Sequence, residues 1–137
     1  MLLNLHLAVM FFSLGVIFFA DKEAFAWISG RKEVLERKRM RLLHLLMWAG
    51  LTALIATGLL LFLPMAIYLL SEPLFVIKLL FVAILVINAI LVGRLMHVAL
   101  TRPYSSLAWQ EKLPLLTSGA ISTFSWACAI LIAFYLF

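Results

Sequence analysis

The side chains that could do chemistry in this chain are few, because 66% of its 137 residues are hydrophobic and only 12% are charged. Among the polar residues that interrupt the apolar stretches, four have a ring or amine nitrogen that can bind a metal ion: His6, His44, Lys78 and His97. Ionisable side chains are costly inside a bilayer, so those that occur there are functional candidates by default. We therefore treat these four residues as the candidate ligands of a cofactor.

The four candidates form two pairs if successive apolar stretches cross a membrane in opposite directions. His6 and Lys78 each come early in a stretch that starts outside, whereas His44 and His97 lie near the inner surface. Haem iron accepts axial nitrogen ligands, and ligands on two facing helices can hold it. The pattern predicts haem b as the cofactor, with its iron bound through His6 beside Lys78 or through His44 and His97.

A purely structural role is the alternative for each of these residues. An interfacial histidine can be solvated without a ligand, and Lys78 can extend its amine to the surface. Asn88 and His97 are nine residues apart, which places them on opposite faces of an ideal helix. Only one of them can then point at the centre of a bundle. On the inner side, Arg94 and the Arg37–Arg41 segment supply cations for haem propionates.

Four apolar stretches are long enough to position these residues across a bilayer, whose hydrocarbon core needs about 20 apolar residues in a helix. We predict helices at about 2–29, 41–63, 74–100 and 113–136, in a single transmembrane domain that covers 1–137. The fold class is all-α. It is an integral membrane four-helix bundle with antiparallel up-down topology, because short connections make sequential helices antiparallel neighbours.

The basic residues predict the orientation of this bundle. The connection at about 30–41 is rich in Lys and Arg, the region from Pro64 to Pro73 has neither, and the third connecting region has Arg94, Arg102 and Lys112. By the positive-inside rule the basic loops are cytoplasmic and both termini are outside, in the cell (inner) membrane. Because the net charge of +5 lies beside apolar helices, we expect anionic lipid headgroups as partners rather than nucleic acid. A homo-oligomer and a larger membrane complex both stay open.

Other chemistry lacks the residues it would need. The single cysteine, Cys128, excludes an intrachain disulfide and redox chemistry of the Cys-x-x-Cys type. The sequence has no Ser/His/Asp set, no Gly-rich phosphate loop and no paired carboxylates. Its acidic residues lie in loops or at helix ends, which argues against a proton-coupled exporter that carries a carboxylate in its first helix.

The order of these features resembles the small four-helix membrane proteins related to HemJ and to the CopD copper-resistance domain. The matching parts are Leu5-His6-Leu7, Asp21 at the end of the first apolar stretch, Glu36-Arg37-Lys38-Arg39 before Leu42-Leu43-His44, and Lys78-Leu79-Leu80 with Asn88 ten residues later. HemJ-like proteins bind haem in the membrane and are tied to protoporphyrinogen oxidation. The resemblance implies that His6 and Lys78 are the better haem pair. The family's Asn-Glu-Pro-like stretch is replaced here by Glu111-Lys112-Leu113-Pro114, so the bundle is implied more strongly than the oxidase activity.

The sequence therefore predicts a haem-b-binding membrane protein that handles electrons, in oxidoreduction linked to a porphyrin or a quinone. If the protein is an enzyme, it is a membrane oxidoreductase. The alternative is a non-enzymatic membrane subunit or assembly factor, in which the polar residues only hold the helices together.

Overall fold

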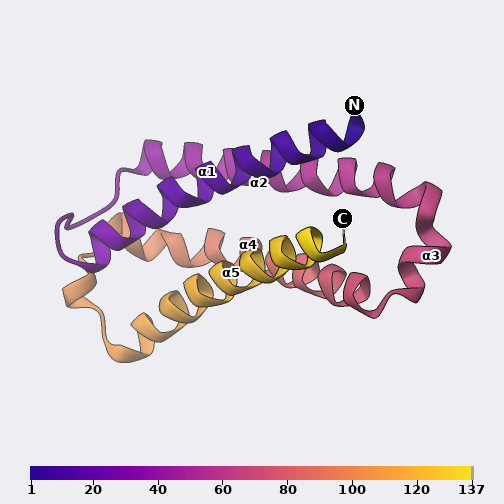
Figure 1. Ribbon diagram of the computed structural model, residues 1–137. Coiled ribbons are helices and arrows are strands. Elements are labelled where there is room, and N and C mark those ends of the chain that lie inside the picture. The colour runs from indigo at the N-terminus through magenta and orange to yellow at the C-terminus, as the bar shows by residue number, and fades with distance from the viewer. Residues whose placement is uncertain (137) are drawn as a thin grey trace.

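The computed structural model describes residues 1–136 and is helical throughout, with no strand in that range (Figure 1). In these residues, four helical segments are long and apolar enough to cross a membrane: Leu2–Ile28, Arg37–Ser71, Pro73–Thr101 and Trp109–Leu136. A helix of 27 residues is roughly 40 Å long, which exceeds the ~30 Å hydrocarbon core of a bilayer. The elements along the chain are α1 (Leu2–Ile28), α2 (Arg37–Phe62), η1 (Leu63–Met65), α3 (Ala66–Ser71), α4 (Pro73–Thr101), η2 (Tyr104–Ser106) and α5 (Trp109–Leu136).

The four long helices pack as two pairs. The closest packing is between α1 and α2 and between α4 and α5, whereas α2 and α4 meet over a short stretch (Figure 1). We call α1 with α2 the first hairpin and α4 with α5 the second hairpin. Consecutive long helices run in opposite directions in Figure 1, and both termini lie toward the end of the molecule that holds α3. The prediction of four long apolar helices is confirmed, although they pack as two hairpins rather than around one evenly shared core.

Local sequence explains where α1 and α4 begin and end. Gly30 follows α1 with a φ of +80°, a conformation that glycine adopts without steric cost and that commonly ends a helix. Pro73 is the first residue of α4, where its missing N–H is not needed. The backbone of Arg102 is extended because Pro103 follows it, and α4 stops at Thr101.

Two helices begin earlier than the sequence predicts. α2 starts at Arg37, so part of the basic segment forms its first turn. α5 starts at Trp109, where the Glu111 side chain accepts a hydrogen bond from the backbone N–H of Ala108 at 3.0 Å. A glutamate at the third helical position that bonds back to the N-cap residue is half of a capping box. This contact extends α5 upstream of Pro114, which lies inside the helix.

The two hairpins are joined firmly at one end, which we call the basic end because it holds the Lys/Arg-rich connection between α1 and α2. The buried side chains there form one cluster of Trp27, Leu35, Met40, Ala99 and Leu107. The last carbonyls of a helix have no partner within it. At the end of α4, the Ala99 carbonyl accepts the Leu35 N–H at 2.9 Å. Just beyond α4, the Arg102 carbonyl accepts the Trp27 indole N–H at 3.0 Å.

The opposite end, which we call the α3 end, joins the hairpins mainly through the chain itself. Helix α3 and the preceding 3₁₀ turn η1 connect α2 to α4, and Leu69 is the buried residue of α3. The Phe62 and Phe75 rings stack with centroids 5.6 Å apart and planes 1° from parallel. Along the rest of the molecule, large apolar side chains cover the outer surface, which suits a multi-pass membrane protein and leaves little buried core between the hairpins.

Candidate functional site

His6 is held between the two helices of the first hairpin near the α3 end. Its Nδ1 lies 2.7 Å from the Thr57 hydroxyl on α2, and a Cβ placed on Gly58 would lie 3.5 Å from its Cε1. The small residue at 58 lets the imidazole approach the α2 backbone. His6 is half-buried, whereas Met10 and Ser13 on the same face of α1 are buried against α2.

The direction of the His6–Thr57 hydrogen bond follows from the other contacts of Thr57. A threonine hydroxyl has one hydrogen to donate. The Thr57 hydroxyl donates it to the Ala53 carbonyl at 2.7 Å, one turn earlier on α2. The hydroxyl oxygen must therefore accept from His6 Nδ1–H. In the neutral imidazole this places the lone pair on Nε2, which has no hydrogen bond within residues 1–136.

Lys78 is the predicted partner of His6. It lies on α4, the first long helix of the second hairpin, and is close enough to act on His6 electrostatically. Its amine forms neither a hydrogen bond nor an ion pair with the part of the chain that the structure describes, and the side chain is half-buried. The structure thus brings His6 and Lys78 to one region, between the first hairpin and α4 at the α3 end.

His44 is engaged in a different way, near the basic end. Its Nε2 accepts a hydrogen bond from the Trp48 indole N–H at 3.1 Å, one turn later on α2. The same Nε2 would lie 3.2 Å from a Cβ placed on Gly93 of α4. The imidazole thus fills the space between α2 and α4, and its Nε2 lone pair is already in use. A haem cannot enter between this nitrogen and α4 without separating the two helices.

The inner pair does not form a shared site. His97 is exposed, and no hydrogen bond joins it to His44 within the described chain. His44 contacts α4 at Gly93, one turn before His97. Of the two predicted pairs, His6 and Lys78 lie in one region and His6 Nε2 has no hydrogen bond within residues 1–136, whereas His44 Nε2 is occupied by Trp48. No group of three or more metal-type side chains occurs in residues 1–136.

Asn88 serves the packing of the second hairpin. It is buried, and its side-chain amide donates to the Ser118 carbonyl on α5 at 3.1 Å. The Ser118 hydroxyl returns a bond to the Asn88 side-chain oxygen at 2.8 Å. This reciprocal pair satisfies both side chains where water is absent. Asn88, not His97, is therefore the residue of α4 that points at its neighbouring helix.

The cations expected to neutralise haem propionates lie at the wrong end for His6. Arg41, the last residue of the basic segment, precedes Thr57 by 16 residues, which is roughly 24 Å along α2. Arg94 is exposed toward the end of α4. The Arg37–Arg41 segment instead takes part in the basic end, where Arg39 pairs with Glu23 at 3.2 Å.

Several residues that shape these contacts carry no signal in the sequence. Thr57, Ser118 and Gly93 look like small packing residues, and only the partner helix shows what each one does. Glu23 lies among other charges near the end of α1, yet it binds both Lys32, at 2.6 Å, and Arg39. Asp21, two residues earlier, is exposed and forms no ion pair within residues 1–136.

Comparison of the chain with models of known protein families, with curated proteins and with solved structures finds no match.

Proposed function

We propose that the protein is a haem-b-binding membrane protein that handles electrons, in which His6 would hold the haem iron together with Lys78 of α4. The observation that carries this proposal is the hydrogen bond from His6 Nδ1–H to Thr57, which leaves Nε2 free. Histidines that bind metals through one nitrogen commonly donate the other N–H to a fixed acceptor, which sets the tautomer and the ring orientation. The hydrogen bond of His6 to Thr57 is an arrangement of this kind.

Each residue of the proposed site would have a separate role. His6 would bind the iron and Thr57 would hold its ring, while the apolar side chains of α1, α2 and α4 would exclude water. Lys78 can donate an electron pair only as a neutral amine, which an apolar surrounding favours. Bound haem would supply one-electron transfer. The resemblance to the HemJ and CopD group supports the same pair of residues and a reaction linked to a porphyrin, and a quinone-linked reaction is the alternative.

The membrane orientation belongs to this proposal. We infer that the basic end is cytoplasmic and that the α3 end and both termini are outside, in the cell membrane, because cytoplasmic connections carry the excess of Lys and Arg. The haem would then lie toward the outer surface. Reporter fusions at the C-terminus and in the connection at 30–36 should give opposite sidedness.

A visible absorption spectrum tests the haem proposal directly. The protein is purified in mild detergent, haem is added, and spectra are recorded before and after dithionite. A Soret band that shifts on reduction is expected for the wild type and for His44→Ala and His97→Ala, but not for His6→Ala. Lys78→Met should keep a band with a different position, because one ligand is replaced. A wild-type preparation that takes up no haem, or an unchanged spectrum for His6→Ala, contradicts the assignment.

A second function, as a non-enzymatic membrane subunit or assembly factor, is favoured by a separate observation. Asn88 is hydrogen-bonded to the backbone and side chain of Ser118 on the neighbouring helix, and His44 to Trp48 of its own helix, so their polarity is used in helix packing. For this function we expect a colourless protein that co-purifies with a membrane partner. Haem uptake that depends on His6, without any such partner, would exclude it.

A further inference from the structure

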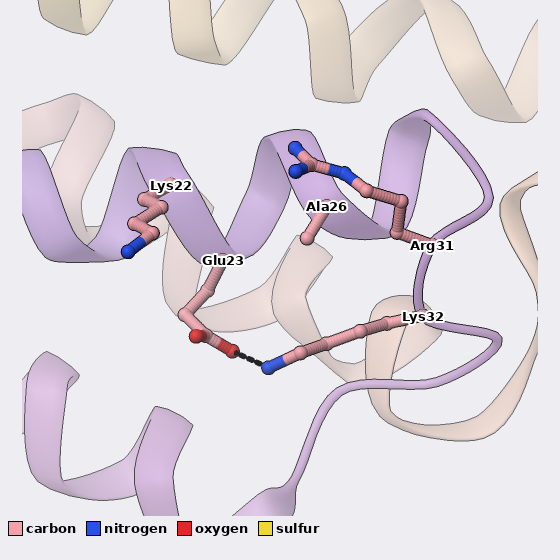
Figure 2. Close-up of a pocket in the computed structure, with 5 residues that line it drawn as sticks. All are labelled: Lys22, Glu23, Ala26, Arg31 and Lys32. Atoms are coloured by element: carbon pink, nitrogen blue, oxygen red, sulfur yellow. Dashed lines mark hydrogen bonds and ion pairs between the residues drawn. The ribbon is translucent and has the colours of Figure 1, made fainter.

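We propose that a hollow at the basic end binds the phosphate group of an anionic phospholipid. Five residues line it, three of them cationic: Lys22, Glu23, Ala26, Arg31 and Lys32 (Figure 2). The first three come from the last turns of α1, and the other two from the connection to α2. Its volume of about 310 Å³ would hold roughly ten water molecules, enough for a phosphate group and its neighbours.

The charge lining this hollow is unbalanced. Lys32 reaches back from the connection to bind Glu23 at 2.6 Å, as Figure 2 shows. Glu23 is also shared with Arg39 at 3.2 Å, so its negative charge already serves two cations. Lys22 and Arg31 form no ion pair within residues 1–136. The lining therefore keeps an excess of positive charge that an anion would neutralise.

The guanidinium of Arg31 is already positioned to bind an oxyanion. Its Nε donates to the Ser29 hydroxyl at 3.2 Å, and its Cζ lies 5.6 Å from the centre of the Phe25 ring. The two terminal nitrogens have no hydrogen bond within the described residues and can bind two phosphate oxygens together, as arginine commonly does. Ala26 has only a methyl side chain, which leaves space between Arg31 and the Glu23–Lys32 pair.

The depth of the hollow favours a lipid over a soluble phosphate. The chain is uncharged from Leu2 to Ala20 and becomes charged at Asp21 and Lys22, where α1 leaves the hydrocarbon. Phe25, one turn further along α1, is 62% exposed beneath the Arg31 guanidinium, which suits the headgroup region of a bilayer. A phosphate group at this level belongs to a lipid whose chains lie along α1. The inference does not depend on haem.

Binding of single lipids to the detergent-purified protein tests the site, with native mass spectrometry as the readout. The probes are phosphatidylglycerol and phosphatidylcholine. The variant Lys22→Gln with Arg31→Gln removes two cations of the hollow and keeps the Glu23 contacts. The matched control, Arg37→Gln with Lys38→Gln, removes the same charge from exposed residues of the same basic segment outside the hollow.

We expect the wild type to prefer phosphatidylglycerol and the hollow variant to bind it roughly 30-fold more weakly, since each cation near an anionic lipid contributes about fivefold. The control should lose less than about threefold. Equal losses in the two variants would show diffuse attraction and overturn the site, as would a wild type without lipid preference. Displacement of the lipid by inorganic phosphate at equal concentration would assign the site to a soluble anion and overturn the lipid assignment.

Discussion

At the α3 end, His6 donates its Nδ1–H to Thr57 and keeps Nε2 free, whereas at the basic end His44 uses Nε2 to accept the Trp48 indole N–H. Both are half-buried histidines on transmembrane helices, and both lie against a glycine of another helix. The difference comes from the partner. An indole can only donate, so it occupies a lone pair, while a hydroxyl whose hydrogen is already used can only accept. The chemistry open to a buried histidine therefore depends on its neighbour.

The two ends also differ in how the hairpins are joined. At the basic end, the Trp27 indole N–H of α1 donates to the Arg102 carbonyl just beyond α4. The Leu35 N–H, in the connection between α1 and α2, donates to the Ala99 carbonyl of α4. At the α3 end, the two hairpins are joined by the covalent connection through α3 and by the stacked rings of Phe62 and Phe75. The basic end should therefore carry more of the stability that holds the two hairpins together.

The largest expected effect in this comparison is at Trp27. Trp27→Ala removes a side chain that is 2% exposed, its hydrogen bond to Arg102 and its edge contact with Tyr104. Truncating a buried tryptophan costs roughly 3–5 kcal/mol. Unfolding in mixed detergents should show this loss, whereas Trp109→Ala, at a position 66% exposed, should change stability by about 0.5 kcal/mol or less. Equal losses would mean that the basic end does not hold the hairpins together.

Gly93 tests the contact between the hairpins at His44. Gly93→Val places atoms against the imidazole and should cost roughly 1–3 kcal/mol, as overpacking does. Gly119→Val is the matched control, because a Cβ there meets nothing within 4 Å and the helix propensity change is the same. The same unfolding measurement compares them. If the two variants are equally stable, α4 does not pack closely against the His44 imidazole at Gly93.

The smallest change in stability should come from Thr57→Val, which removes the acceptor of His6 and keeps the shape. We expect a loss of about 1 kcal/mol or less, since polar contacts between membrane helices average ~0.6 kcal/mol. Haem affinity should fall more visibly, by roughly 10–100-fold, because outer contacts of a ligating histidine have effects of that size. Haem titration followed at the Soret band measures it, with Thr57→Ser as the control that keeps the hydroxyl. Unchanged affinity in Thr57→Val would remove the support that this hydrogen bond gives to the haem proposal.

Much of the fold could be predicted from composition and local signals. Four uninterrupted apolar stretches predict four long helices, because the bilayer sets their length and forces the backbone to bond within each helix. Gly30, Pro73 and Pro103 give the bounds of α1 and α4 for local steric reasons. The starts of α2 and α5 were predicted too late, because helices can continue through polar residues beyond the hydrocarbon and Glu111 caps α5 upstream.

The amino-acid sequence by itself determined which residues are available for chemistry: three histidines, one membrane lysine and a basic segment beside apolar helices. Only the tertiary structure decided how His6 is used, since its hydrogen bond to Thr57 of α2 leaves Nε2 free, whereas His44 Nε2 is occupied by Trp48 of the same helix. The bond between His6 and Thr57 requires residues 51 positions apart to meet. Apolar helices in lipid have nearly uniform surfaces, so helix packing depends on a few small and polar residues whose partners are fixed only when the helices associate.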